Sequence, residues 1–427
     1  MYKCDFKLRR QLLEEKMAKL KIGVFGGFRG RRMVSQVAGS ADAELVAVCD
    51  RHPAAIETCR KLAEEAGMYN VAYYSDFEEF FKHDMDAVIL ANYANEHVPY
   101  AIRCLESGRH VMSEVLTCAN MKEAVELIEA VERTGKLYTY AECYCYTPVR
   151  WEMRNRYLRG DIGELMYAEG EYIHDCASVW PQITYGDRNH WRNRMSSTFY
   201  CTHSIGPILT MTGLRPTQVT GFETKSMPFT RNVGYPGGTL GMEIINLSNG
   251  SVMKSVHFNM KHTTEVSNYQ LNGEWGGMKD LGDGRLALYL EDHGKNGRFE
   301  TVTPEHLIEE AKYTVHGGGD YYTTYYFIRA LLGDEVARER VIDVYQAVDM
   351  CTPGILGYRS IINGNEPVKV PDLRNKCERD AYRNDRFCTF PENGGDQYVS
   401  NNNWGDPEIP DSVYEEVKRK WLAGEEG

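Results

Sequence analysis

A short glycine-rich turn near the N-terminus is the first place where residue types and spacing suggest chemistry. It follows an apolar run at residues 21–25 and consists of Phe25, Gly26, Gly27, Phe28, Arg29 and Gly30. Glycines in such a turn let the backbone approach a pyrophosphate, whose charge the N-terminus of the following helix stabilises. The match to GxGxxG is incomplete, because alignment on Gly27 and Gly30 puts Phe25 at the first glycine position. By itself the turn is equally compatible with a plain strand-to-helix connection.

An acidic residue at the end of the second apolar run strengthens the nucleotide interpretation. Asp50 closes the run 44–50 and lies 20 residues after Gly30. A carboxylate at that place accepts hydrogen bonds from the adenosine ribose hydroxyls and disfavours a 2′-phosphate. Arg51 follows it and could soften this discrimination. The sequence therefore predicts NAD as the cofactor in preference to NADP.

The segments that must position these residues alternate as in βαβ units. Nearly continuous apolar runs occupy residues 21–25, 44–50, 86–91, 110–115 and 136–142. Helix-like segments lie between them at 53–66, 96–107 and 121–134. Strands that alternate with such helices form a parallel sheet, and continuous apolar runs fit strands that are covered on both faces. Residues 21–145 are therefore predicted to be a dinucleotide-binding Rossmann domain.

After Tyr146 the hydrophobic pattern changes. A helix is expected at 148–159 and a strand at 166–174, and segments that alternate apolar and polar residues follow at 218–225, 239–247, 251–260, 265–273 and 285–292. Asn249 and Gly250 mark a hairpin. Helices return at 320–332 and 338–362, and a last short helix is expected near 411–422. This pattern predicts a largely antiparallel sheet that is open to a ligand on one face.

The predicted fold is thus α/β, an N-terminal Rossmann domain followed by a C-terminal α+β domain with a largely antiparallel open sheet. We expect a helical N-terminal extension at 1–20, the Rossmann domain at 21–145, a substrate-binding domain at 146–370 and an extended C-terminal arm at 371–427. A sheet with one exposed face also favours a homo-oligomer.

Composition narrows the classes of function. Against 61 Asp and Glu there are 49 Lys and Arg, a net charge of −12, which argues against a nucleic-acid partner. The 12 cysteines are scattered without CxxC spacing, which favours reduced thiols in a cytoplasmic protein. Residues 1–21 lack the apolar run of a signal peptide, and no segment approaches the length of a membrane span.

The segment DAVILANYANEHVPYAIRCLESGRHVMSEV (86–115) resembles the Gfo/Idh/MocA oxidoreductases. The resemblance covers roughly residues 20–370 and implies a Rossmann domain joined to an α/β domain whose open sheet carries the substrate site. With the glycine turn, it implies that NAD is bound by Gly26, Gly27, Phe28, Arg29, Gly30, Asp50, Arg51, Asn92, His97 and Glu114. Many relatives carry EKP, whose lysine takes part in proton transfer. Here that stretch is Glu114, Val115 and Leu116, so another group must manage the proton.

Further segments resemble the branch that contains NAD-dependent N-acetylgalactosaminidases. They are AECYCY (141–146), GEYIHD (170–175), YCTHSIGP (200–207), HGGGDYY (316–322) and IDVYQAVDM (342–350). The resemblance implies Tyr200 and His203 as the acid/base pair and His316 as a further catalytic group. It also implies a substrate pocket formed by Glu142, Tyr144, His174, His190, Trp191 and Arg192.

Structural alternatives stay open for these residues. His203 could be a core or helix-start histidine, His316 a loop histidine, and Tyr144 and Tyr146 packing at the domain junction. Trp180 to Arg192 form a polar aromatic loop that suits stacking on a sugar, although such loops also cover domains. Oxygen and nitrogen ligands could come from Glu171, His174, Asp175 and His203, but their spacing does not require a metal and none is expected.

Three functions follow for this site. The first is an NAD(H)-dependent oxidoreductase of a sugar or glycoside, with hydride transfer at a ring C3 hydroxyl; the breadth of the family favours it. The alternative is a glycoside hydrolase that works by transient C3 oxidation, elimination and re-reduction; Val115 in place of lysine and the YCTHSIGP segment favour it. A remote alternative is a non-catalytic sensor of NAD or sugar.

Overall fold

The computed structural model describes residues 19–258, 267–405 and 407–424. The helical extension expected at 1–20 falls almost entirely outside these residues, and Leu20 already begins the first strand. Within the described part of the chain, no helix has the length and apolar character needed to span a membrane.

The first domain contains a parallel six-stranded sheet in the order β3-β2-β1-β4-β5-β6. Its strands are β1 (Leu20–Phe25), β2 (Ala43–Cys49), β3 (Ala72–Tyr74), β4 (Ala87–Leu90), β5 (His110–Ser113) and β6 (Tyr138–Tyr140). The accompanying helices are α2 (Gly27–Ala38), α3 (Pro53–Glu65), α4 (Phe77–Phe81), α5 (His97–Glu106) and α6 (Met121–Thr134). This order confirms the Rossmann prediction, and it reverses direction between β1 and β4, where such sheets bind ligands at the carboxyl ends of their strands.

The second domain contains a nine-stranded sheet in the order β14-β13-β12-β11-β7-β10-β9-β8-β15. Its strands are β7 (Leu165–Ile173), β8 (Pro216–Glu223), β9 (Gly241–Leu247), β10 (Val252–Phe258), β11 (Ser267–Gly273), β12 (Gly276–Asp280), β13 (Leu286–Leu290), β14 (Arg298–Val302) and β15 (Val368–Lys369). Only β7 and β10 pair in parallel among the strand pairs of this sheet that the structure describes. The expected largely antiparallel sheet is therefore confirmed, including the hairpin at Asn249 and Gly250.

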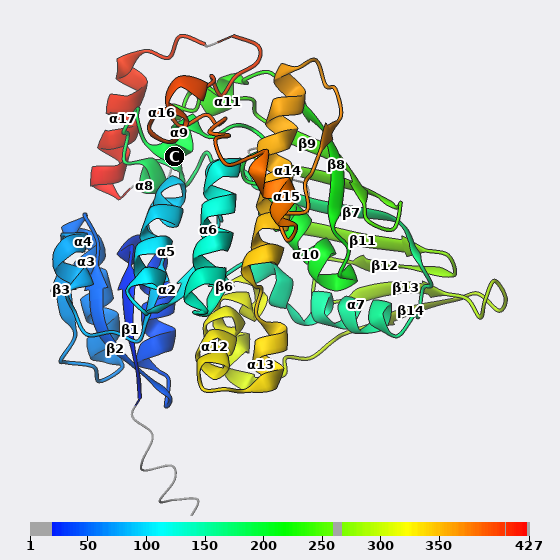
Figure 1. Ribbon diagram of the computed structural model, residues 1–427, viewed down its shortest axis with the longest axis horizontal. Coiled ribbons are helices and arrows are strands. Elements are labelled where there is room, and N and C mark those ends of the chain that lie inside the picture. Colours follow the sequence, from blue (N-terminus) through cyan, green and yellow to red (C-terminus); the bar gives the residue numbers. More distant parts are fainter. Residues whose placement is uncertain (1–18, 259–266, 406, 425–427) are drawn as a thin grey trace, which may run out of the picture.

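Two long helices cover the inner face of the second sheet. They are α10 (Thr202–Thr212) and α14 (Val344–Ile362), and Figure 1 shows both between the second sheet and α6. Glycines allow the close approach: a Cβ at Gly170 would lie 1.9 Å from the Ser204 carbonyl oxygen. The outer face carries an ion network, in which Lys254 Nζ lies 3.0 Å from Glu169. The site described below lies on the helix-covered side, not on the open face that the sequence suggested.

The structure has two helices where the sequence predicted a single one. Instead of a continuous helix at 338–362, the chain forms α13 (Glu335–Arg340) and then α14. The backbone N–H of Tyr140 donates to the Ile342 carbonyl at 2.9 Å, and Asp343 begins α14 with a capping box. This break ties the second domain to β6, the edge strand of the first sheet.

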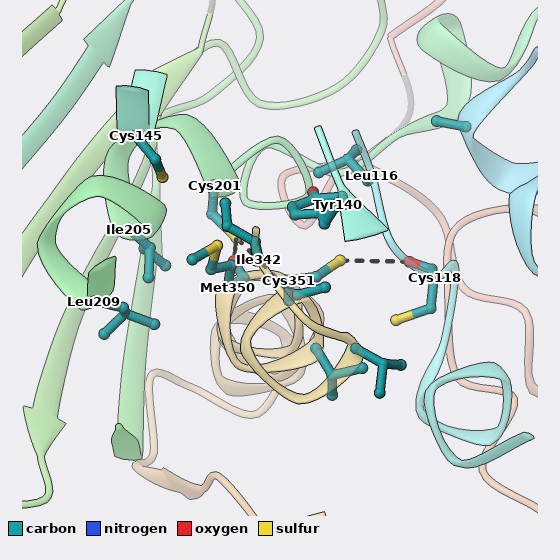
Figure 2. Close-up of a cluster of buried hydrophobic side chains, with 14 of the residues drawn as sticks. Leu116, Cys118, Tyr140, Cys145, Cys201, Ile205, Leu209, Ile342, Met350 and Cys351 are labelled. Atoms are coloured by element: carbon teal, nitrogen blue, oxygen red, sulfur yellow. Dashed lines mark hydrogen bonds between the residues drawn. The ribbon is translucent and has the colours of Figure 1, made fainter. Parts of the chain in front are cut away.

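The two domains share a hydrophobic core that is rich in cysteine. In Figure 2, Cys351 of α14 points toward the first domain, where its thiol donates to the Cys118 carbonyl at 3.5 Å. Cys201 lies at the start of α10 and donates to the Met350 carbonyl at 3.4 Å. The described cysteines are all free thiols, and the buried ones pack as small apolar side chains.

The C-terminal segment packs back across the first domain (Figure 1). It contains α15 (Lys376–Asp380), α16 (Pro391–Gly394) and α17 (Asp411–Ala423). Arg379 is fully buried and pairs with Glu132 of α6 at 2.8 Å. Helix α17 packs against α8 (Trp180–Thr184), which places the end of the chain beside the nucleotide cleft.

Candidate active site

A cleft of about 210 Å³ opens at the carboxyl ends of β1 and β4. The first domain contributes Phe25, Gly26, Phe28, Arg29, Asp50, Arg51, His52, Ala91, Asn92 and Tyr93. The second domain contributes Ile183, Tyr185, His190, Trp191 and Arg192. The cleft lies where a Rossmann domain binds its dinucleotide, with the start of α2 at its floor.

The geometry of the glycine turn explains why its sequence match is incomplete. Gly26 has φ 100°, and a Cβ there would lie 2.2 Å from the Ala91 carbonyl carbon. Gly27 begins α2, and a Cβ at Gly30 would lie 2.7 Å from Val24. Gly26, which does not fall on a glycine position of the aligned pattern, therefore makes the tight turn that the cofactor needs.

Asp50 and Arg51 lie at the entrance to α2. Asp50 accepts hydrogen bonds from the backbone N–H groups of Gly27 at 2.6 Å and Phe28 at 3.2 Å, so its carboxylate holds the turn. Arg51 lies over the Tyr93 ring at 4.2 Å and pairs with Glu96 at 2.7 Å. Arg51 is thus already paired with a carboxylate of the first domain.

Two buried polar atoms in the cleft have no hydrogen-bond partner among the described residues, Asn92 Oδ1 and His190 Nε2. One is an acceptor and the other belongs to a ring that can donate, so a polar ligand could satisfy both. Together with the cleft in front of the glycine turn, these atoms fit a dinucleotide.

His97 does not line the cleft but lies behind it, where it connects two loops. Its Nδ1 lies 2.8 Å from the Leu116 carbonyl and its Nε2 lies 3.2 Å from the Asn92 carbonyl. Burial lowers the pKa of His97 to about 4, so the ring is neutral at pH 7. The histidine braces the two loops behind the cleft and does not line it.

A second pocket of about 140 Å³ adjoins the cleft and shares Ile183 and Arg192 with it. Its other lining residues are Tyr172, His174, Cys176, Val179, Trp180, Met195 and Tyr200. His174 and Tyr200 thus line this second pocket, whereas His190 and Trp191 line only the nucleotide cleft. The reason is the fold of the loop around α9 (Trp191–Arg194), which sets the His190 ring 4.6 Å from Tyr93.

His203 lies at the start of α10 and is held by a buried carboxylate. Its Nδ1–H donates to both oxygens of Glu142, at 2.8 and 2.9 Å. Glu142 is fully buried, so it orients the histidine and does not line the pocket as the sequence suggested. With the proton fixed on Nδ1, Nε2 of His203 carries a free lone pair and can accept a proton.

Aromatic rings surround His203. Tyr200, Tyr144 and Tyr172 have ring centroids 5.1, 4.9 and 4.5 Å from the imidazole. Tyr144 lies in turn 5.6 Å from His316. The sequence did not single out Tyr172, although it lies near the end of β7 and two residues before His174, which follows the strand directly; this spacing puts both side chains on one side of an extended chain.

A chain of charges links the glycine turn to His316. Arg29 lies 2.7 Å from Glu114 and 2.8 Å from Asp320, which also accepts from His316 Nδ1 at 3.1 Å. Burial opposes ionisation of Asp320, but hydrogen bonds from His316 and Arg29 outweigh it and lower the pKa of the carboxyl well below its usual range. Burial raises the pKa of Glu114, which Arg29 opposes. Asp320 is a second missed residue, four positions after His316.

One group of described residues has the spacing of metal ligands. Ligand atoms of Cys143, His316 and Asp320 lie within 4.8 Å of one another. Arg29 already pairs with Asp320, so a cation there would face a guanidinium. The set weighed from the sequence, which included Glu171 and Asp175, does not converge in this way among the described residues.

Comparison with known proteins agrees with this geometry. Residues 20–142 match the oxidoreductase family with an NAD-binding Rossmann fold, Gfo/Idh/MocA, and residues 288–377 match the C-terminal domain of glycosyl hydrolase 109. The first domain belongs to the Gfo/Idh/MocA family. The match to that family covers the first-domain lining of the nucleotide cleft, and the glycosyl hydrolase match covers His316 and Asp320, the partner of Arg29.

Curated relatives match most of the length of this chain. A glycosyl hydrolase family 109 protein 1 of Bacteroides thetaiotaomicron is 26% identical over 406 residues, 85% of this chain and 86% of the relative. A family 109 protein of Porphyromonas gingivalis is 25% identical over 409 residues, 85% and 86% of the two chains.

Solved structures share the fold. Levoglucosan dehydrogenase in complex with NADH and L-sorbose superposes with a TM-score of 0.66 at 16% identity, over 83% of this chain and 100% of the other. An Agrobacterium radiobacter oxidoreductase in complex with NAD+, L-tartaric acid and magnesium gives 0.66 at 16% identity, over 82% and 98%.

Proposed function

We propose that this enzyme is a glycoside hydrolase that uses NAD held in the cleft between the two domains, with no net redox change. Relatives that match most of the chain are named family 109 glycosyl hydrolases, and their C-terminal domain is matched here. This support moves the hydrolase ahead of the net sugar oxidation that the sequence put first. The observation that carries the proposal is His203, whose Nδ1 is fixed by buried Glu142 while Val115 replaces the lysine of the oxidoreductases.

When bound, NAD+ would accept a hydride from C3 of the sugar and later return it. His316, held by Asp320, takes up the proton of the C3 hydroxyl and gives it back at the end. His203 Nε2 removes the C2 proton, which a C3 ketone makes acidic, and returns it after water has added to C1. The two histidines thus restore every proton they take.

Tyr200 supplies the remaining proton transfer in this proposal. Burial raises the pKa of its phenol, opposed by Arg192, so the group is protonated at neutral pH. It donates its proton to the glycosidic oxygen as the C1–O bond breaks, and recovers one from the water that adds to C1. Tyr172 and His174 line the same pocket and are placed to contact the sugar.

One assay separates the candidate functions. We would incubate the protein with aryl glycosides and free sugars, with and without NAD, and follow both NADH absorbance and aglycone release. Cleavage without net NADH supports the hydrolase. Net NADH without cleavage would establish the dehydrogenase, and NAD binding with neither would indicate a sensor.

Two site variants and one control complete the test. Tyr200→Phe and His203→Ala should suppress cleavage, because they remove the proposed acid and base. Tyr398→Phe changes a half-exposed tyrosine on the C-terminal segment, outside the pocket, and should keep full activity. Full activity in both site variants would overturn the assignment of these residues.

A further inference from the structure

A segment of the second domain, Trp180 to Arg194, covers the nucleotide cleft on the side opposite the glycine turn; we call it the roof segment. Helix α17 packs against it. Neither family match covers these elements, since the matches span residues 20–142 and 288–377. Ile183, Tyr185 and His190 of this segment face the glycine turn across the cleft. A dinucleotide in the cleft would therefore lie between the two domains.

His190 presents a hydrogen-bond donor to this space. Its Nδ1 accepts from the Arg192 backbone N–H at 3.2 Å, so Nδ1 is unprotonated and the proton of the neutral ring is on Nε2. Burial, with Arg192 and Arg51 nearby, lowers the pKa of His190 to about 2, so the ring is neutral. His190 is 2% exposed and its Nε2 has no partner among the described residues. A buried donor of this kind points to a ligand oxygen.

Tyr185 closes the mouth of the cleft between the two domains. Its ring lies 4.5 Å from His52 and 6.4 Å from Phe28, both of the first domain. Trp421 of α17 lies 5.0 Å from the same ring and 6.4 Å from the His52 ring. Tyr185 is therefore packed against both the first domain and α17.

Helix α17 is itself fixed to the roof segment. A Cβ at Gly186 would lie 2.5 Å from the Tyr414 carbonyl, so the helix touches the backbone there. Arg188 lies over the Tyr414 ring at 4.2 Å and also pairs with Asp411. Roof segment and helix thus form one packed unit.

We propose that segment 180–194, held by α17, is a clamp that retains the dinucleotide between turnovers, with His190 Nε2–H donating to one of its ribose or phosphate oxygens. The clamp rests on the proposed function in one respect, that NAD is the occupant of the cleft. An enzyme that returns its hydride to the same sugar does not need to exchange cofactor, so slow release is compatible with turnover.

The test measures release of isotopically labelled NAD+ from the loaded protein into excess unlabelled NAD+. Trp421→Ala removes the support of Tyr185. His190→Asn keeps a side chain that caps α9 well but loses the distal donor. His190→Asn should release label roughly tenfold faster or more, the scale of one hydrogen bond to a charged group. Trp421→Ala should release it roughly twofold to tenfold faster, the scale of one aromatic contact. Trp421→Phe keeps a ring and should stay close to the parent protein.

Leu422→Ala is the matched control, because Leu422 is the next residue of α17 and is 70% exposed. It should release NAD+ at the parent rate. Equal rates in Trp421→Ala, His190→Asn and Leu422→Ala, with unchanged melting temperatures, would overturn the clamp. Because the release assay needs no glycoside, the clamp can fail while cleavage persists, and cleavage can fail while the clamp holds.

Discussion

Replacing Glu142 by glutamine is expected to disable His203 as a base while leaving the fold intact. In the native site both carboxylate oxygens accept from His203 Nδ1, and Oε1 also accepts from the Tyr144 backbone N–H at 3.1 Å. Glutamine has the same size, and its amide oxygen will keep the bond from Tyr144. Its NH2 group then faces His203 Nδ1.

Two changes decide the magnitude. Glutamine carries no negative charge to stabilise the imidazolium that forms when His203 takes up a proton, and its NH2 group, at the former Oε2 position 2.9 Å from Nδ1, competes with the amide oxygen as the partner of Nδ1 and favours the tautomer that lacks a lone pair on Nε2. A positioned general base contributes about 10²–10⁴-fold to rate. We therefore expect kcat for glycoside cleavage to fall by about 10²–10⁴-fold in Glu142→Gln, with small changes in KM and in NAD+ binding.

The chain offers a matched control for this change. Glu243 and His257 form a second fully buried pair at 2.9 Å, away from the pocket. Glu243→Gln should lower the melting temperature, as loss of a buried charge partner does, without a selective effect on kcat. An unchanged kcat in Glu142→Gln, or an equal loss in both variants, would refute the reasoning.

Three further predictions concern the nucleotide domain and its link to His316. Gly26→Ala should weaken NAD+ binding in a titration, because an alanine with the positive φ of this position costs roughly 1–3 kcal/mol and its Cβ would meet Ala91. Gly108→Ala is the control: this glycine has φ 90° but open space around it, so the variant should bind NAD+ normally. His97 has a pKa lowered from 6.5 to about 4, so the unfolded state binds more protons between these values and stability falls as pH falls, by up to about 3 kcal/mol. Melting temperatures of His97→Gln should depend less on pH in that window, and a parallel dependence would contradict the argument. Asp320→Asn should lower the free energy of unfolding toward the low end of roughly 3–5 kcal/mol, because Glu114 still neutralises Arg29. The same change should alter the pH profile of kcat, because Asp320 holds His316. An unaltered profile would exclude that link.

Much of the fold was predictable because it depends on local patterns. The strands of the first sheet are short apolar runs, and β7, β9 and β10 alternate apolar and polar residues, so period and length were enough. The short strand β3 was missed because its three half-buried residues carry no such pattern. The break before α14 was missed because it is fixed by a long-range bond between Tyr140 and Ile342.

In the candidate site, too, residues in local motifs could be predicted and residues positioned by domain packing could not. Gly26 and Asp50 were found from the glycine turn and from the spacing of the strand ends, and His203 and His316 lie in short motifs that a family resemblance singled out. The positions of Glu142 behind His203 and of His190 in the nucleotide cleft depend on how the two domains pack, which no local pattern reports. Trp421 is a lone aromatic in a polar helix, and only the fold brings it to Tyr185.

The central claim is that NAD transiently oxidises a glycoside so that its aglycone leaves by elimination. The most direct measurement is cleavage of an aryl glycoside in D2O by protein loaded with one equivalent of NAD+, with the released sugar analysed by NMR. Many turnovers without net NADH, and deuterium at C2 of the product, are the result that we predict. Cleavage with C2 fully protonated, or one NADH formed for each sugar consumed, would contradict it.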